Sequence, residues 1–167
     1  MSPPFRREQY ELLRQLRNRP ENRRWFFCAD ERSREEQKAW YRQYLEKEND
    51  YMFTVTLPTA PDEFVGTVAV YDYRPEDDSF EIGRLLLDSR KPECRGLGKE
   101  IVHCVCQIVE KQFPARMCSA LRAEIFEDNE RSVRCFLANG FQACGARILH
   151  SRHVVLMRRA IKIEEME

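Results

Sequence analysis

The order of helix and strand patterns along the chain predicts an α+β fold, a three-layer α/β sandwich around a mixed central sheet of about six to seven strands. Two segments with helical spacing of apolar residues come first, and three β-rich segments follow them. A strand–helix–strand unit comes next, and such a crossover joins two parallel strands. We therefore expect an antiparallel meander, one parallel pair at the sheet centre and four helices.

The first two helices are expected at residues 8–18 and from residue 33 to about residue 49. Apolar residues recur on one face of the first helix, and Pro20 ends it. Ser33 is placed to cap the second helix, with Glu36 three residues on as its capping-box partner. The connector between these helices either packs them onto the sheet or lines a substrate pocket with Arg23, Arg24, Trp25, Phe26 and Phe27.

The rest of the chain alternates between strand and helix periods. Runs of turn-forming residues separate the three β-rich segments, and the helix after the third of them has a broad apolar face. Asn139-Gly140 is a stop signal for the helix that follows. We expect strands at 51–57, 64–73, 80–87 and 121–126, helices at 97–112 and 130–138, and a closing hairpin at 141–151 and 154–157.

Length and charge restrict the classes of function. A chain of 167 residues is expected to form one domain over residues 1–167. Its 28 basic and 28 acidic residues cancel, so bulk electrostatics favour neither nucleic acid nor a membrane as a partner, and any anion site must be local. The sequence shows no signal-peptide pattern, and no apolar run approaches the roughly 20 residues needed to cross a bilayer.

The seven cysteines favour a reducing compartment. Their number is odd and several lie in apolar runs, which is typical of buried thiols rather than of a disulfide framework. Cys104 and Cys106 would point to different faces of a helix, and the histidines are few and scattered, so we expect no metal site. We expect a cytoplasmic monomer or homodimer.

Residues 88–102 have the pattern of an anion site. An apolar strand ends, a basic loop follows, and an apolar-periodic helix begins, so the unpaired N–H groups of a helix start lie beside several cations. Gly96 and Gly98 lack a Cβ, so a ligand can approach the backbone closely. Glu100 excludes a P-loop, which needs Ser or Thr there, and Ile101 excludes a dinucleotide fingerprint, which needs a third Gly. The alternative is a turn with a solvated basic face.

The segment Arg95-Gly96-Leu97-Gly98-Lys99-Glu100 resembles the Arg/Gln-x-x-Gly-x-Gly/Ala pyrophosphate loop of the GNAT family of N-acetyltransferases, with Glu100 departing from the usual small residue. A second segment, residues 129–141, resembles the family's Asn-x-x-Ala/Ser-x-x-x-Tyr-x-x-x-Gly-Phe pattern, with Phe136 at the tyrosine position. The resemblance covers residues 12–157. It implies the GNAT fold, whose opening strand would fall in the first seven residues, where two prolines make it short or absent.

The resemblance also implies an acetyl-CoA site without metal. The family's tyrosine protonates the leaving thiolate, and a phenylalanine cannot donate a proton. In the branch that acetylates protein N-termini a serine at the position of Ser132 is placed for this step, so Ser132 is the candidate acid. The residues expected to bind the coenzyme are Leu85, Leu86, Leu87, Arg90, Arg95, Gly96, Leu97, Gly98, Lys99, Glu100, Asn129, Ser132 and Phe136.

Glu81 is the candidate general base, because amide formation from an amine requires loss of a proton. It lies on the strand that leads into the loop and is flanked by Phe80 and Ile82, surroundings that disfavour a charged carboxylate. In the resembling family a glutamate on this strand often orders water or takes the proton. The alternative is a structural partner of Arg84 or another buried cation, and Asp72 is the fallback base.

The acceptor is expected to be a primary amine on a small molecule, such as a nucleotide-linked amino sugar. The first third of the chain looks like the branch that holds ribosomal-protein N-terminal and amino-sugar acetyltransferases, so protein N-termini are the alternative acceptors. A non-catalytic acyl-CoA sensor is the alternative of another class. The residues expected to border the acceptor are Arg24, Trp25, Phe26, Tyr71 and Tyr73, with sheet-face packing as the alternative for the two tyrosines.

Overall fold

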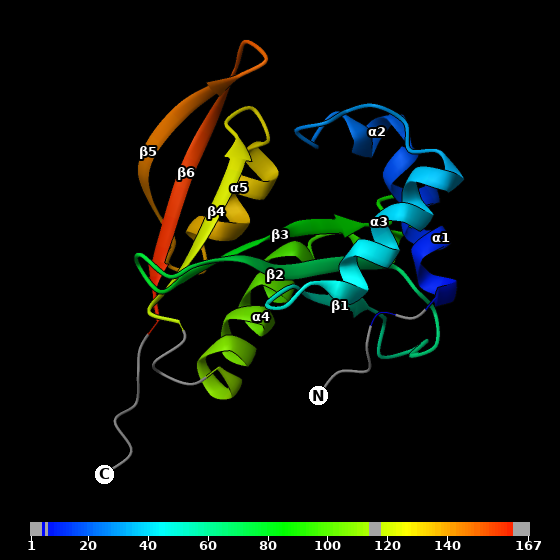
Figure 1. Ribbon diagram of the computed structural model, residues 1–167, viewed down its shortest axis with the longest axis horizontal. Coiled ribbons are helices and arrows are strands. Elements are labelled where there is room, and N and C mark those ends of the chain that lie inside the picture. Colours follow the sequence, from blue (N-terminus) through cyan, green and yellow to red (C-terminus); the bar gives the residue numbers. More distant parts are fainter. Residues whose placement is uncertain (1–4, 6, 114–117, 162–167) are drawn as a thin grey trace. The chain divides into compact units, whose positions relative to one another are not determined.

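The computed structural model describes residue 5, residues 7–113 and residues 118–161. Its six strands form one mixed sheet in the order β1-β2-β3-β4-β6-β5, in which β3 and β4 are parallel and the β1–β2, β4–β6 and β5–β6 pairs are antiparallel. This confirms the expected fold class. The elements in chain order (Figure 1) are α1 (Arg7–Asn18), α2 (Pro20–Arg23), α3 (Arg34–Glu46), β1 (Tyr51–Val55), β2 (Gly66–Arg74), β3 (Ser79–Leu87), the 3-10 turn η1 (Pro92–Cys94), α4 (Gly98–Gln112), β4 (Ala120–Phe126), α5 (Glu130–Leu137), β5 (Gln142–Leu149) and β6 (Arg152–Ala160).

The helix count differs from the expectation by one short helix. The described residues form five α-helices, because Pro20 begins the additional one-turn helix α2 as well as following the end of α1. Proline has a fixed φ suited to the first helical position, where its missing N–H is not needed. The opening strand considered for the first seven residues falls on residues 1–4 and 6, outside the described part, and on Phe5 and Arg7, which are not in a strand.

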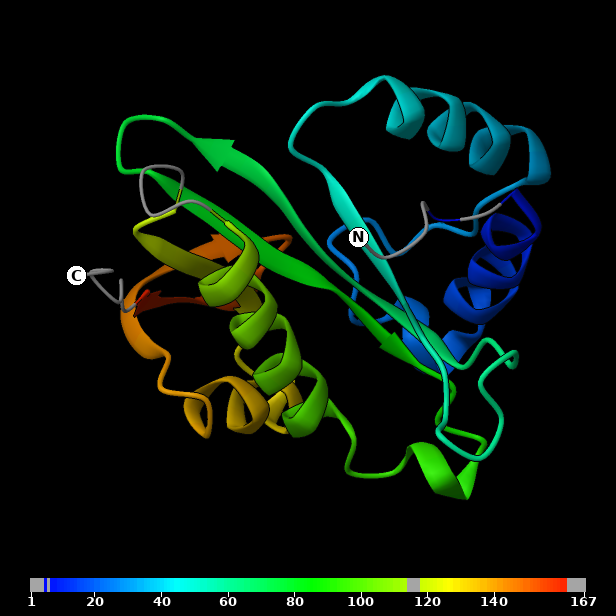
Figure 2. The same cartoon turned by 90° about the horizontal axis from the view of Figure 1, so that it is seen from below.

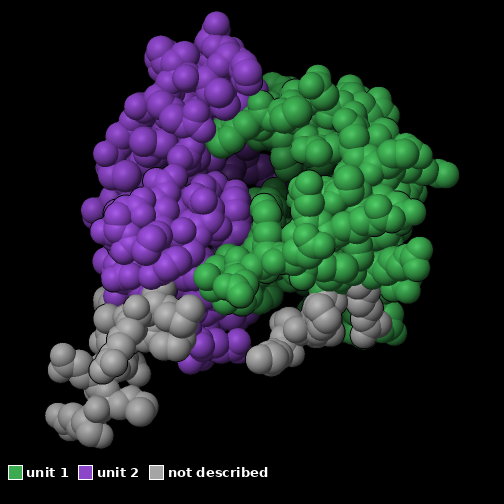
Figure 3. All heavy atoms as spheres, in the orientation of Figure 1, with its two compact units in different colours: residues 1–70, 84–95 green, residues 71–83, 96–167 purple. Residues whose placement is uncertain are grey.

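The chain groups into two compact units, which Figure 3 colours separately. Unit 1 comprises residues 1–70 and 84–95, and unit 2 comprises residues 71–83 and 96–167. Strands β2 and β3 therefore each contribute residues to both units. Each unit is described below by itself.

In unit 1, α1 and α3 contact each other through aromatic side chains. Phe5 is buried and lies edge-on to Trp40, while Tyr10 stacks on Tyr41 with ring centroids 5.1 Å apart. The expected capping box at the start of α3 is confirmed: Ser33 Oγ accepts from the Glu36 N–H at 3.1 Å, and the Glu36 carboxylate accepts from the Ser33 N–H at 2.7 Å. Burial of aromatic surface thus joins the two helices.

In unit 2, α4 and α5 lie side by side and contact each other (Figure 2). The apolar stripe of α4 is buried, as are Leu121 and Ala123 of β4, which alternate with the charged Arg122 and Glu124. Phe80 of β3 is fully buried and lies edge-on to Phe113. Strand alternation thus gives one apolar face of β3 and β4 and one polar face, on which the candidate site is found.

Two residues inside strands have positive φ, and both lie next to a boundary between the units. Asp72 of β2 has φ 51° and Arg84 of β3 has φ 50°, whereas the units divide after Val70 and after Gly83. A left-handed residue inside a strand breaks the alternation of side chains, as a bulge does, and for a residue other than glycine it costs energy. Such outliers are often found at functional sites.

Candidate active site

Glu81 lies at the last paired position of the parallel strands β3 and β4 in unit 2. The recorded register is Ser79 with Ala120, Phe80 with Leu121 and Glu81 with Arg122, although β3 runs on to Leu87 and β4 to Phe126. Pairing among the described residues of these strands thus stops at Glu81. Backbone N–H and C=O groups beyond this point are left for other partners. Strand alternation places the Glu81 side chain on the face of β3 opposite Phe80 and Ile82.

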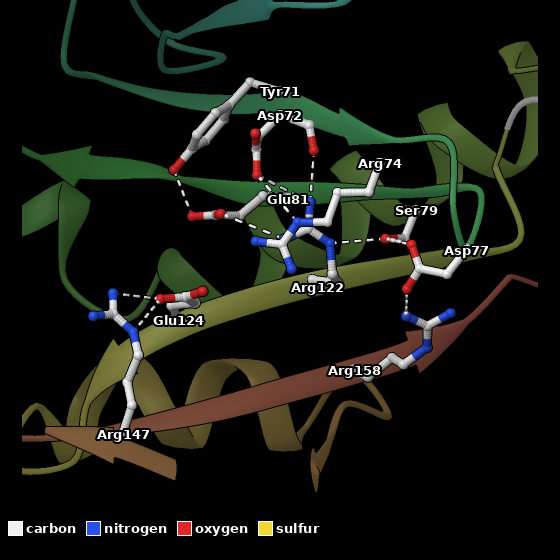
Figure 4. A network of polar contacts seen from close by, with 10 residues as sticks. All are labelled: Tyr71, Asp72, Arg74, Asp77, Ser79, Glu81, Arg122, Glu124, Arg147 and Arg158. Carbon is white, nitrogen blue, oxygen red and sulfur yellow. Dashed lines mark hydrogen bonds and ion pairs between the residues drawn. The ribbon is translucent and has the colours of Figure 1, made fainter. Parts of the chain in front are cut away.

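The Glu81 carboxylate is largely buried and held by neighbours from both adjacent strands (Figure 4). Its side chain is 13% exposed, Tyr71 Oη of β2 donates to Glu81 Oε1 at 2.6 Å, and Arg122 Nη1 of β4 lies 3.7 Å from Oε2. Burial raises the pKa of Glu81, and the nearby Glu124 carboxylate acts in the same direction, whereas Tyr71 and Arg122 lower it. A carboxyl group with a raised pKa is suited to accept a proton near neutral pH.

Arg122 is the centre of the polar cluster in Figure 4, and the sequence analysis did not single it out. It is 7% exposed, and it donates to Ser79 Oγ at 2.8 Å and to the Asp72 carbonyl at 2.6 Å. Its buried Nη1, which faces Glu81, has no hydrogen-bond partner among the described residues. A sequence signal existed, because Arg122 and Glu124 interrupt an otherwise apolar strand at every second residue. Its pairing with Glu81, however, depends on the strand register.

The Tyr71 side chain passes close to Gly83 on its way to Glu81. A Cβ built on Gly83 would lie 2.8 Å from Tyr71 Oη, so a larger residue there would displace the phenol. Tyr73, by contrast, has its ring 4.9 Å from that of Phe80 and donates to Asp78 at 2.7 Å. The positive φ of the intervening Asp72 thus separates the two tyrosines. Tyr71 thus joins the Glu81 cluster, whereas Tyr73 packs on Phe80 and bonds Asp78.

The contacts of Glu81 fit the alternative in which it is the structural partner of a buried cation other than Arg84. Arg84 pairs with Asp50 at 2.6 Å rather than with Glu81, so the buried cation beside Glu81 is Arg122. Asp72, the fallback base, is half exposed and pairs with Arg122 at 3.2 Å and Arg74 at 3.5 Å.

The N-terminus of α4 has the features expected of an anion site. Leu97 is the N-cap and provides no side-chain hydrogen bond to the first turn. Lys99 and Glu100 are exposed, Gly96 has φ 85°, and a Cβ on Gly96 would meet no atom within 4 Å. Gly98 differs, because a Cβ there would lie 3.0 Å from the Cys135 Sγ of α5. Gly98 therefore permits close packing of α4 on α5 besides any approach of a ligand.

The cations expected around this loop divide into two groups. Within unit 1, Arg90 pairs with Glu21 at 2.9 Å, and Lys91 pairs with Glu63. Arg95 and Lys99 are exposed, and neither side chain has a hydrogen bond or ion pair within the described part of the chain. Leu85 and Leu87 of β3 are partly exposed, whereas Leu86 is buried. Arg95 and Lys99 are thus the cations still available for an anion.

The α5 residues are placed mainly by capping and packing. Asn129 caps the helix by accepting from the Ser132 N–H at 3.3 Å. Ser132 is partly exposed, and no side-chain hydrogen bond of its hydroxyl is recorded in the described part. Phe136 is 2% exposed and lies edge-on to Phe141, with ring centroids 5.0 Å apart. The residue at the family's tyrosine position therefore belongs to the core of unit 2.

Unit 1 contains a cavity of about 250 Å³ beside α1 and α3. Phe26 and Phe27 of the aromatic connector line it, together with Trp40. Arg24 and Trp25 are not among its lining residues, and the Arg24 guanidinium lies 4.4 Å from the centroid of the Trp25 ring. The polar lining comes from Arg17, Arg32, Gln37, Thr67 and Arg84.

All seven cysteines are free, with Cys94, Cys106 and Cys118 buried. Within residues 5, 7–113 and 118–161 no group of three or more His, Cys, Asp or Glu side chains is arranged to hold a metal ion. No helix in this part is both long and apolar enough to cross a bilayer.

Comparison with known sequences supports the resemblance found in the motifs. The sequence profile of the acetyltransferase (GNAT) domain matches residues 3–142, which is most of the chain. No curated protein sequence is significantly similar.

Solved structures share the fold at low sequence identity. The chain resembles spermidine N-acetyltransferase from Vibrio cholerae, solved with CoA and spermine, with 14% identity, a TM-score of 0.78, and coverage of 95% of this chain and 94% of that one. A domain from Methanocaldococcus jannaschii is 22% identical, with a TM-score of 0.76 and coverage of 95% and 96%. The aminoglycoside acetyltransferase AAC(6')-Ib, solved with ribostamycin and coenzyme A, is 17% identical, with a TM-score of 0.72 and coverage of 92% and 88%.

Proposed function

Because this chain belongs to the GNAT family of acetyl-CoA-dependent N-acetyltransferases, we propose that it acetylates the primary amine of a small molecule with Glu81 as the general base. The amine nitrogen attacks the thioester carbonyl carbon of acetyl-CoA, a C–N bond forms, and the C–S bond breaks. The products are the N-acetylated amine and CoA, which leaves as a thiolate and is protonated to the thiol. The ammonium form of the acceptor must first lose a proton.

The environment of Glu81 is the observation that carries this proposal. Its carboxylate is largely buried, has a raised pKa, and is oriented by the Tyr71 hydroxyl at 2.6 Å. It lies where the recorded β3–β4 pairing ends. A carboxylate with a raised pKa is a better acceptor for the proton of an ammonium group, directly or through a water molecule.

We further propose that the start of α4 binds the coenzyme's pyrophosphate. The N-terminal amides of this helix receive no cap from Leu97, and Arg95 and Lys99 supply nearby positive charge. The thioester end would lie along the end of β3, where a backbone N–H polarises the carbonyl oxygen. Ser132 is the proposed donor to the leaving sulfur, since Phe136 has no proton to give.

Small-molecule acceptors are favoured over protein N-termini by the cavity in unit 1. Its volume of about 250 Å³ is slightly below the roughly 300–1,000 Å³ of sites for drug-sized ligands. A cavity of this size suits a small amine, or one end of a nucleotide-linked amino sugar.

The free thiols fit a reducing compartment such as the cytoplasm.

The test is an acceptor screen read by release of free CoA thiol. Amino sugars, amino acids, polyamines, aminoglycosides and short peptides are incubated with acetyl-CoA, and acetylated products are identified by mass. We expect at least one small amine to be acetylated with a rate that depends on Glu81. Tight binding of acetyl-CoA together with no transfer to any acceptor would favour the alternative of a non-catalytic sensor, which is raised by the absence of the tyrosine acid at Phe136.

A further inference from the structure

The cavity in unit 1 carries more positive charge than its surroundings neutralise. Arg17, Arg32 and Arg84 line it, and none of its lining residues is a carboxylate. Its apolar surface comes in part from Phe26 and Trp40. A cavity that combines cations with aromatic rings favours an anionic ligand that also has an apolar part.

Arg17 is a buried cation without a carboxylate hydrogen-bond partner in the described part of the chain. It is 8% exposed, and its guanidinium donates to the carbonyls of Cys28 at 2.6 Å and Asp30 at 3.0 Å. The guanidinium also lies 4.7 Å from the centroid of the Phe26 ring. Backbone carbonyls orient the group but do not cancel its charge. Burial of a cation in this state is costly, and a bound anion would reduce that cost.

Arg32 adds a second charge at the same place, whereas Arg84 does not. No hydrogen bond or ion pair of the Arg32 side chain is recorded within the described residues, and its charge acts on Arg17 to lower the Arg17 pKa, second to burial. Arg84 is neutralised by Asp50 at 2.6 and 3.0 Å. Most of the neighbouring carboxylates are engaged elsewhere, with Glu11 on Arg14, Glu31 on Arg23, and Glu36 on the Ser33 N–H, while Asp30 is exposed beside Cys28.

We propose, on the basis of the proposed function, that the acceptor amine carries a carboxylate or phosphate group that binds Arg17 and Arg32 in this cavity. Its apolar or ring portion packs on Phe26 and Trp40. A polyamine such as the spermine bound in the Vibrio cholerae structure is a polycation, which these arginines repel. The substrate class is therefore an anionic amine rather than a polyamine.

A binding experiment tests the charge of the ligand independently of transfer. The dissociation constants of 3-phenylpropionate, phenyl phosphate and the neutral 3-phenylpropionamide are measured by calorimetry with CoA present. We expect at least one anion to bind about tenfold or more tightly than the amide, because charge-assisted hydrogen bonds replace neutral ones. The carboxylate and phosphate arms decide which anionic group is preferred.

The variants compare two arginines near the start of α3. Arg32→Glu should abolish the preference for anions, whereas Arg34→Glu, whose side chain is 78% exposed, should leave it intact. Both variants should retain the acetyl-CoA affinity and melting temperature of the parent protein. Equal binding of the amide and the two anions, or equal losses in both variants, would overturn the proposal.

Transfer is then measured with matched acceptors. Glucosamine 6-phosphate is compared with glucosamine, and phenylalanine with phenylalaninamide, with spermidine as the polycation. We expect the anionic member of at least one pair to have the higher kcat/KM by about tenfold, and Arg32→Glu to remove the difference. Transfer to neutral amines or spermidine in preference to both anions refutes the anionic-acceptor proposal alone. Selective anion binding without any transfer refutes the proposed function and leaves the anion site standing.

Discussion

Two arginines of similar burial, one in each unit, have different surroundings. Arg122 in unit 2 is 7% exposed and faces Glu81, Asp72 and the Ser79 hydroxyl. Arg17 in unit 1 is 8% exposed, and its recorded hydrogen bonds go to backbone carbonyls. The first cation is compensated by the protein's own anions, whereas the second is oriented but not compensated.

The difference indicates two uses of a buried charge. At Glu81, Arg122 limits how far burial raises the pKa of the carboxyl, so it tunes a group that remains in the protein. At the cavity, Arg17 and Arg32 leave positive charge to be satisfied by a ligand. In the proposed function the first arrangement serves proton transfer, and in the further proposal the second selects the acceptor.

Replacing Glu81 by glutamine should give the largest effect on activity. We expect kcat near pH 7 to fall by about 10²–10⁴-fold, the usual contribution of a general base. In the parent protein, kcat should decline as pH falls through the raised pKa of Glu81, because the protonated carboxyl is no longer a base. This acid limb should be absent in Glu81→Gln, and the dissociation constant of acetyl-CoA should be unchanged. A variant that retains parental kcat and its acid limb would exclude Glu81 as the base.

Replacing Arg122 should destabilise the protein more than replacing Arg17. Arg122→Met leaves Glu81 buried without its cation, and we expect a loss of about 3–5 kcal/mol in the free energy of unfolding. Arg17→Met leaves two neutral carbonyls without a donor, and we expect a smaller loss of about 1–3 kcal/mol in the free energy of unfolding. Urea unfolding at pH 7 measures both. A loss in Arg17→Met as large as that in Arg122→Met would contradict the distinction between the two sites.

Gly98→Ala should reduce stability because the added methyl group crowds α5, and not because it changes the loop before α4. The added Cβ would lie 3.0 Å from Cys135 Sγ, and we expect a loss of about 1 kcal/mol from overpacking. This loss should disappear when the double variant Gly98→Ala/Cys135→Ala is compared with Cys135→Ala alone. In that background we expect acetyl-CoA affinity still to fall about tenfold, because the coenzyme requires close approach to the backbone. Unchanged affinity there would show that Gly98 serves only helix packing.

Tyr71→Phe should shift the pH dependence without removing catalysis. The hydroxyl hydrogen bond lowers the pKa of Glu81, so its removal raises that pKa further, and the acid limb of kcat moves to higher pH. Well above both pKa values the rates should converge. Tyr73→Phe is the matched control, because that hydroxyl bonds Asp78 instead. An acid limb at the same pH in Tyr71→Phe and the parent protein would show that the bond does not tune Glu81.

The smallest expected effects concern the start of α5. Asn129→Ala removes the helix cap and should cost about 1 kcal/mol of unfolding free energy. Ser132→Ala should leave stability nearly unchanged, because Asn129 accepts from the Ser132 backbone N–H and not from its hydroxyl. If Ser132 protonates the leaving thiolate, kcat should fall by about 10²-fold or more, as expected for general acid catalysis. Unchanged kcat would assign that proton to another group or to solvent.

Local patterns predicted the order and type of the elements well, because each signal lies within a few residues. The Ser33 capping box, the Asn139-Gly140 stop signal and the crossover around α4 are examples. Pro20 predicts the end of α1 but leaves the start of α2 undecided, because proline is found both after helices and at their first position.

The site was only partly predictable, because it depends on register and on long-range packing. Glu81 could be identified from its apolar flanks, but its partner Arg122 follows only from the parallel pairing of β3 with β4. The connector sequence drew attention to Arg24, yet Arg17 lines the cavity from α1. Arg17 follows Leu13 by four residues and so shares its buried face, which is a signal that helical spacing contained.

The left-handed residues Asp72 and Arg84 have a consequence for how this chain can diverge. Each lies within two residues of a boundary between the units, so β2 and β3 each contribute residues to both units. Substitutions at 66–70 and 84–87 alter the neighbourhood of the cavity, while those at 71–74 and 79–83 alter the neighbourhood of Glu81. If the two proposals hold, descendants of this chain can acquire new acceptors through substitutions in the first set of positions while the second set keeps the proton-transfer residues.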